Sequence, residues 1–73
     1  MNRPAVKNLD VVALLHDRPD FGLLAGDVGT VVETLAPDVF EVEFLDDSGR
    51  TVTVEEFRRD DLLLLRHRVN AAA

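Results

Sequence analysis

Cysteine, tryptophan and tyrosine are absent from this chain of 73 residues. Without cysteine, the protein has no disulfide bond, no thiolate metal site and no thiol nucleophile. Without tryptophan and tyrosine, it lacks the rings that line grooves for proline-rich peptides and cages for methylated lysine. These absences exclude several classes of binding and catalytic site.

Basic residues are also scarce, with eight Lys and Arg against fourteen Asp and Glu and a formal net charge of −6. Because a phosphate-binding surface must be electropositive, this balance argues against a nucleic-acid binder or an anionic-membrane binder. No apolar run approaches the roughly 20 residues of a membrane span, and the first residues lack the apolar stretch of a signal peptide. We therefore expect one small cytoplasmic domain.

Five short segments have the composition of β-strands, and turn residues separate them. They are residues 10–15, 28–35, 39–45, 51–55 and 62–65. The first segment does not alternate, so a buried helical turn remains an alternative there. A long loop, 16–27, follows the first segment, and residues 58–61 suit a single helical turn before the last one.

The segment 39–45 has the clearest pattern, because Phe40, Val42 and Phe44 alternate with Glu41 and Glu43. Such alternation is typical of a half-buried strand. The segment 51–55 resumes the pattern, and the two are expected to form a hairpin. The inward-facing side chains of all five segments are expected to make one core, consisting of Val12, Val32, Phe40, Val42, Phe44, Val52, Val54 and Leu64.

These elements predict an all-β fold, a small five-stranded SH3-like barrel with a long first loop and a short helical turn before the last strand. Closure of the barrel would hide the edges that a small flat sheet exposes. We expect the barrel over residues 9–66, with a flexible arm at 1–8 and a flexible tail at 67–73.

Four residues are expected to shape the turns. Gly49, in the hairpin loop 46–50, should have a positive φ, and one of Gly26 and Gly29 should have a strained or positive φ. Asp27 should accept a hydrogen bond from a nearby backbone N–H. We interpret all four as structural residues.

Several stretches resemble a bacterial family of short proteins, domain of unknown function 4926. They are Asp-Val-Val-Ala-Leu at 10–14, Gly-Leu at 22–23, Gly-Asp-Val-Gly-Thr-Val-Val-Glu at 26–33 and Glu-Val-Glu-Phe at 41–44. The likeness covers residues 9–65 and is most specific at 26–32, whereas the charged segment 58–61 departs from the family pattern. The resemblance implies an SH3-like barrel, no established catalytic activity and an association with toxin-like partners.

The pattern Gly-Asp-x-Gly-x-Val at 26–31 also resembles the KOW modules of ribosomal proteins and transcription factors. It is similar as well to the SH3-like domains of nitrile hydratase β subunits and of small photosynthetic electron-transfer subunits. Because these proteins differ in function, the motif indicates a fold rather than an activity.

No group of residues in the sequence predicts catalysis. His16, Asp17 and Asp20 share the first loop, but no second histidine and no nucleophile accompany them, so a solvent-exposed loop is favoured. The segment Asp-Asp-Ser-Gly at 46–49 lacks the spaced oxygen ligands of a calcium loop and is interpreted as a plain turn. We expect no catalytic residue, no bound metal and no cofactor.

Charge is unevenly distributed, since residues 20–56 contain ten acidic residues and only one basic residue, Arg50. Glu41, Glu43 and Glu55 are expected to point outward and to form an acidic face. One interpretation of that face is a solvated surface that favours solubility. The other is a docking surface for a basic protein.

The main hypothesis is a non-catalytic protein-binding module, most sharply a small acidic inhibitor or antitoxin-like partner of a basic protein. One alternative is a KOW-like module associated with nucleic acid, which would need Arg58, Arg59, Arg66 and Arg68 to override the acidic barrel. Another is an accessory subunit or assembly factor of an enzyme complex. We expect a monomer or weak homo-oligomer that associates with neither nucleic acid nor membranes.

Overall fold

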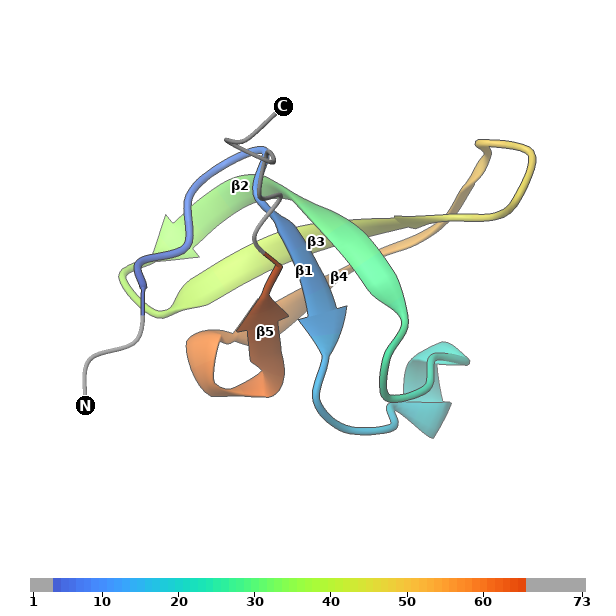
Figure 1. Ribbon diagram of the computed structural model, residues 1–73, viewed down its shortest axis with the longest axis horizontal. Coiled ribbons are helices and arrows are strands. Elements are labelled where there is room, and N and C mark those ends of the chain that lie inside the picture. Colours follow the sequence, from blue (N-terminus) through green and yellow to red (C-terminus); the bar gives the residue numbers. More distant parts are fainter. Residues whose placement is uncertain (1–3, 66–73) are drawn as a thin grey trace, which may run out of the picture.

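The computed structural model describes residues 4–65 and contains one sheet of five antiparallel strands, in the spatial order β4-β3-β2-β1-β5 (Figure 1). The strands are β1 (Val11–Leu14), β2 (Val28–Ala36), β3 (Val39–Leu45), β4 (Thr51–Arg58) and β5 (Leu62–Leu64). Two short 3-10 turns are present, η1 (Pro19–Phe21) in the first loop and η2 (Arg59–Asp61) before β5. The all-β fold, its five strands and the helical turn before the last strand are thus confirmed.

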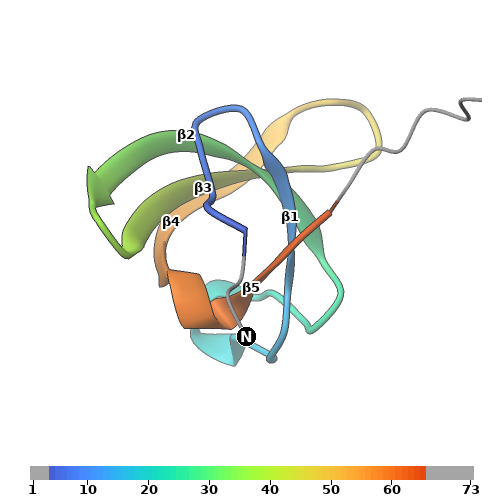
Figure 2. The ribbon, with the colours of Figure 1, turned by 60° about the vertical axis from the view of Figure 1, so that its left-hand side comes forward.

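The sheet is strongly bent but not closed. The start of β2 pairs with β1, whereas the rest of β2 pairs with β3, and two register shifts interrupt the second pairing. Such irregularities bend a strand and increase its twist, and Figure 2 shows the strands curving around a common interior. Within residues 4–65, the edge strands β4 and β5 do not pair with each other, so closure into a barrel is not confirmed.

The alternation predicted for β3 is confirmed. Phe40, Val42 and Phe44 are each at most 3% exposed and face the core. Glu41 and Glu43 lie on the opposite face and are half-buried. We call the side of β2, β3 and β4 that carries Phe40 the inner face and the side that carries Glu41 the outer face.

On β4 the predicted phase, that is, which alternate residues point inward, is wrong. Val52 and Val54, which were expected to point inward, are 58% and 41% exposed. Phe57 is 1% exposed and lies directly opposite Phe40, so it belongs to the inner face. Residues separated by an odd number of positions point to opposite sides of a regular strand. Burying a phenylalanine removes more apolar surface from water than burying a valine, so Phe57 sets the phase.

On β2 the inward residue is Val31 and not the predicted Val32. Val31 is completely buried opposite Val42, whereas Val32 lies at a register shift and is 39% exposed. Val12 is buried as predicted, and Leu64 is partly buried against the core. The complete buried cluster consists of Val6, Val12, Leu14, Leu23, Val31, Phe40, Val42, Phe44, Phe57 and Leu62.

The packed structure begins before Leu9, where the sequence predicted the start of the barrel. Val6 is 9% exposed and belongs to the core, and the N–H of Leu9 donates to the Val31 carbonyl at 2.7 Å. Arg59 is 8% exposed, and its guanidinium donates to the carbonyl of Pro4 at 2.8 Å. The tail predicted at 67–73 lies outside the described residues.

Candidate functional site

Three glutamates form a row across the outer face of the sheet. Glu33 of β2 lies directly opposite Glu41 of β3, and Glu41 lies directly opposite Glu56 of β4. Directly opposite residues in an antiparallel pair have Cβ atoms about 4.5–5.5 Å apart. We call Glu33, Glu41 and Glu56 the acidic row, and it brings three carboxylates onto adjacent strands.

No ion pair within residues 4–65 involves the acidic row, although Arg58 shares the outer face two residues after Glu56. The ion pairs there join Lys7 to Asp10 and Arg18 to Asp20, and neither pair involves the row. Like charges at directly opposite positions destabilise a sheet. The row is therefore slightly unfavourable for folding and strongly negative at the surface.

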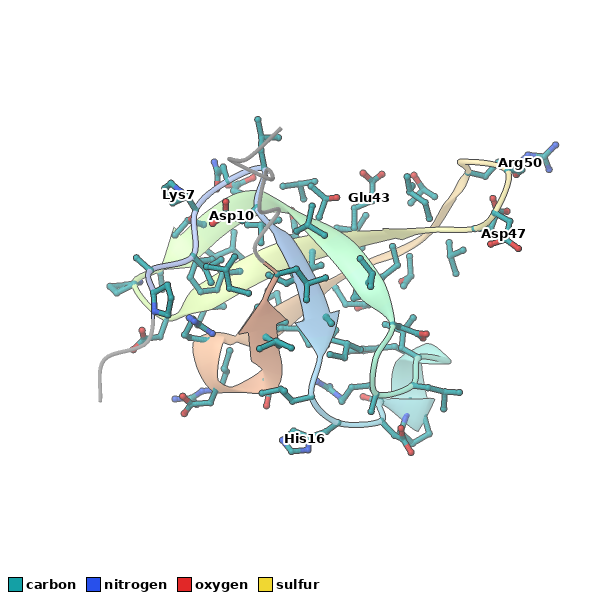
Figure 3. The ribbon with its side chains drawn as sticks, viewed as in Figure 1. Lys7, Asp10, His16, Glu43, Asp47 and Arg50 are labelled. Atoms are coloured by element: carbon teal, nitrogen blue, oxygen red, sulfur yellow. The ribbon has the colours of Figure 1, made fainter. Side chains whose placement is uncertain are left out.

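Glu43 extends the negative charge along β3, and Figure 3 shows it projecting outward from the sheet. It lies between Thr30 of β2 and Val54 of β4. Its carboxylate accepts a hydrogen bond from the Thr51 hydroxyl at 2.6 Å, which fixes its position beside the row. The strand pairing therefore places Glu41 and Glu43 on the outer face, where the sequence predicted them.

Glu55 does not join this face, which corrects the placement predicted for it. The register sets Glu55 opposite Val42, on the inner face, two residues before Phe57. Its carboxylate accepts a hydrogen bond from the Thr53 hydroxyl at 2.6 Å and is partly buried. Glu56 takes the outward position instead, for the same reason that Phe57 sets the phase of β4.

Arg18 of the first loop covers part of the inner face, a contact that the sequence analysis missed. Its guanidinium carbon lies 4.4 Å from the centre of the Phe21 ring and 5.4 Å from that of Phe57. It also donates to the Asp20 carboxylate at 3.1 Å. That hydrogen bond raises the pKa of Arg18 and lowers the pKa of Asp20. The cation is thus held inside the loop, over aromatic faces that attract it.

Asp17 of the first loop also has a structural partner, whereas His16 is exposed. Asp17 accepts the Ala25 N–H at 2.8 Å, while His16 is exposed at the end of the molecule away from Glu43 (Figure 3). No group of three or more potential metal ligands occurs in the part of the chain that the structure describes. Asp17 and Asp20 therefore shape the loop instead of meeting at His16.

The four predicted turn residues have clear structural reasons. Gly49 and Gly26 have φ of 86° and 91°, as predicted. Gly29 has an ordinary φ, but a Cβ there would lie 2.7 Å from a side chain of β3. Asp27 accepts the Leu24 N–H at 2.9 Å, which confirms its predicted role.

A hollow of about 230 Å³ opens between the first loop and the β3–β4 hairpin. Leu23 and Phe44 form its base, and Val28, Leu45 and Val52 are each more than half exposed at its rim. Gly22 and Asp27 complete the lining, so the hollow beside the start of β4 is partly polar and partly apolar.

The arginines proposed for nucleic-acid binding are not equivalent. Arg59 is buried, and its guanidinium donates to the carbonyls of Leu62 and Pro4 at 2.8 Å each. Arg58 is exposed, and Arg66 and Arg68 lie outside the described residues. Arg59 is consequently a structural residue.

Comparisons with known proteins give a family but no annotated relative. A search of curated proteins and a search of solved structures each find no match. No helix within residues 4–65 has the length and apolar character needed to cross a bilayer. The model of a domain of unknown function, DUF4926, matches residues 8–64, a range that includes all five strands and the acidic row. The chain therefore belongs to the DUF4926 family, as the resemblance centred on residues 26–32 implied.

Proposed function

We propose that this protein is a non-catalytic protein-binding module that docks a basic protein on its outer face. In its sharpest form it is an acidic inhibitor or antitoxin-like partner of that protein. The observation that carries the proposal is the acidic row, in which Glu33, Glu41 and Glu56 stand side by side. The net charge of −6 acts in the same direction.

The acidic row lowers the stability of the folded protein. Threonine or valine would suit the exposed face of a sheet better than glutamate, so folding alone has no need for glutamate there. Each pair of directly opposed like charges lowers stability by a few tenths of a kcal/mol, up to about 1 kcal/mol. A basic surface placed over the row would convert that repulsion into attraction and would accelerate encounter between the two proteins.

We further infer that the sheet is an open form of the SH3-like arrangement. Three features support this: the long first loop, the 3-10 turn η2 before the last strand, and a β2 that pairs with β1 through residues 28–30 and with β3 through residues 30–36. In this arrangement the outer face of β2, β3 and β4 is continuous, and the acidic row lies across it.

The proposal is tested by the kinetics of association. The partner is captured from the source cell, identified by mass spectrometry and purified. Its association rate is then measured with Glu41→Lys and with the control Asp47→Lys, which changes the charge equally at the distant tip of the β3–β4 hairpin (Figure 3). We expect Glu41→Lys to slow association roughly tenfold at low salt and Asp47→Lys to have a much smaller effect.

High salt should reduce the difference between the two variants, since the Debye length shortens to about 3 Å at 1 M. Equal association rates for Glu41→Lys and Asp47→Lys at low salt would contradict docking at the acidic row. The surface would then serve solubility alone.

The nucleic-acid alternative loses support because Arg59 is buried and engaged with backbone carbonyls. We predict that the protein passes through a heparin column at low salt without retention, because its surface charge opposes that of the polyanion. Retention on heparin that falls as salt is added would contradict this prediction and would support the hypothesis of a KOW-like module associated with nucleic acid.

A further inference from the structure

The strand β4 is an unpaired edge of the sheet. It is eight residues long and, among the described residues, pairs only with β3, whereas β5, at the other edge, has three residues. Within residues 4–65, no backbone hydrogen bond joins β4 to any segment other than β3. An edge strand of this kind presents a row of free N–H and C=O groups that another extended segment can bind.

β4 carries some of the features that protect natural edge strands, namely the inward-pointing Glu55, the charged Glu56 and Arg58, and one register shift, but it lacks others. Residues 51–58 contain no proline and no lysine, and the single register shift with β3 lies near the hairpin. Val52 and Val54 are exposed, and Glu56 ends the acidic row at this edge. The edge is therefore long, partly apolar and negatively charged.

We propose that an extended basic segment of the partner pairs with β4 as a sixth, antiparallel strand. This inference rests on the proposed function, because it specifies how the basic partner docks. The acidic row runs across the strands from Glu33 to Glu56, so its next position belongs to the added strand. A lysine or arginine at that position would lie directly opposite Glu56 and form a favourable cross-strand pair.

The register also predicts the neighbouring side chains of the added strand. In an antiparallel pair, the residue two positions after the basic one lies on the same face, opposite Val54. The residue two positions further lies opposite Val52, which lies at the register shift with β3 and at the rim of the hollow. The segment should therefore read basic-x-apolar-x-apolar from its N-terminus, and main-chain hydrogen bonds would supply much of its affinity.

Charge decides between a partner and a second copy of the chain. Residues 51–58 carry Glu55 and Glu56 against Arg58, and each chain has a net charge of −6. Two such edges would repel each other, whereas a basic segment is attracted. The occupant of β4 is therefore a basic segment of another protein.

The probe is a synthetic peptide, Thr-Lys-Thr-Val-Thr-Val-Thr with blocked ends, titrated into isotope-labelled protein and followed by NMR. We expect amide shifts and slower amide exchange concentrated in residues 51–58. Replacing the lysine of the peptide by glutamate should abolish binding. Two further peptides carry N-methyl groups, one at its odd-numbered residues and the other at its even-numbered residues. One of them should lose binding and the other should keep it, because only one set of N–H groups faces β4.

Two protein variants with the same charge change locate the binding edge. Glu56→Lys should weaken peptide affinity at least tenfold, since Glu56 directly faces the added strand. Glu33→Lys should weaken peptide affinity less than about threefold. Glu33 lies three strand spacings of about 4.8 Å each from the added strand, and this distance exceeds the Debye length of about 8 Å at physiological salt.

The alternative outcomes are distinct. Equal losses from Glu56→Lys and Glu33→Lys, with both N-methylated peptides still binding, would overturn strand addition and leave docking on the acidic face intact. No amide shift at millimolar peptide would also overturn it, while the kinetic comparison of Glu41→Lys with Asp47→Lys tests the proposed function separately. Concentration-dependent protection of β4 without peptide would assign the edge to a second copy and overturn the inference.

Discussion

Gly29 and Gly49 are required for different physical reasons. A Cβ on Gly29 would lie 2.7 Å from Cγ1 of Val42 and 2.8 Å from the backbone oxygen of Glu43. A Cβ on Gly49 would meet nothing within 4 Å, but its φ of +86° is one that L side chains rarely adopt. The first position lacks space, and the second lacks a permitted backbone conformation for other residues.

The two glycines should therefore respond differently to substitution. We expect Gly29→Ala to lower the free energy of unfolding by about 1–3 kcal/mol through steric overlap. Gly49→Ala should lower it by about 1–2 kcal/mol through backbone strain. Asparagine should be tolerated better than alanine at Gly49 and worse at Gly29, as measured by urea unfolding. The same ranking of the two residues at both positions would contradict this distinction.

Phe44 is a core residue at which truncation should be damaging. It is 3% exposed, and its ring centre lies 5.7 Å from that of Phe57 in an edge-to-face arrangement. We expect Phe44→Ala to lower the free energy of unfolding by about 3–5 kcal/mol, a large share of the stability of a small domain. The control Val54→Ala should change it by about 0.5 kcal/mol or less, because Val54 is an exposed residue of the neighbouring strand. Similar thermal midpoints for the two variants would show that the inner face is wrongly assigned.

At the scale of the elements, the β3–β4 hairpin depends on Asp46. Its Oδ1 accepts the N–H of Ser48 at 2.8 Å, the hydroxyl of Ser48 at 2.6 Å and the N–H of Arg50 at 3.0 Å. These hydrogen bonds, the one from the Ser48 hydroxyl above all, lower the pKa of Asp46 below its ordinary value of 3.8. The folded protein therefore releases this proton more readily than the unfolded chain does.

This lowered pKa predicts a pH dependence of stability. Above pH 3.8 the carboxylate is charged in both states and its stabilising effect is complete. As pH falls through the lower pKa of the folded state, that contribution is lost. Asp46→Asn keeps an accepting oxygen but cannot titrate in this range, so its thermal midpoint should fall less than that of the original protein between pH 6 and pH 3. An equal fall in both proteins would contradict a role for this carboxylate.

How well each strand could be predicted depends on whether its pattern allows one phase or two. β3 has a single phase, with three apolar residues alternating with two glutamates, and the structure has the same arrangement. β4 has two competing phases, because Val52 and Val54 favour one and Phe57 favours the other. The buried area of Phe57 decides between them. The prediction also ended the strand at residue 55, two residues before Phe57.

At the scale of the whole molecule, the candidate surface depends on strand register, which the local sequence did not specify. An acidic outer face followed from Glu41 and Glu43 alone. The row required Glu33 and Glu56, whose positions follow from the register shift in β2 and from the phase of β4. The role of Arg59 was equally hidden, because its partner Pro4 lies 55 residues away in the sequence.

Arg59 connects the two ends of the described chain. One nitrogen of its guanidinium donates to the Leu62 carbonyl and the other to the Pro4 carbonyl, each at 2.8 Å. A planar guanidinium can serve two carbonyls in fixed directions, whereas the ammonium of lysine is a single compact centre on a flexible chain. A substitution by lysine would therefore leave at least one of these two carbonyls, which lie in a buried and a partly buried hydrogen bond, without its donor.

We accordingly expect Arg59→Lys to lower the free energy of unfolding by about 1–3 kcal/mol, the range for an unsatisfied buried polar group. The control Arg58→Lys changes the neighbouring, exposed arginine and should have an effect of about 0.5 kcal/mol or less. Because the Pro4 contact holds the segment that carries Val6, amide exchange at residues 6–9 should accelerate in Arg59→Lys beyond the change elsewhere in the sheet. Uniform acceleration across all strands would show that Arg59 contributes only to global stability and does not specifically fasten the N-terminal segment.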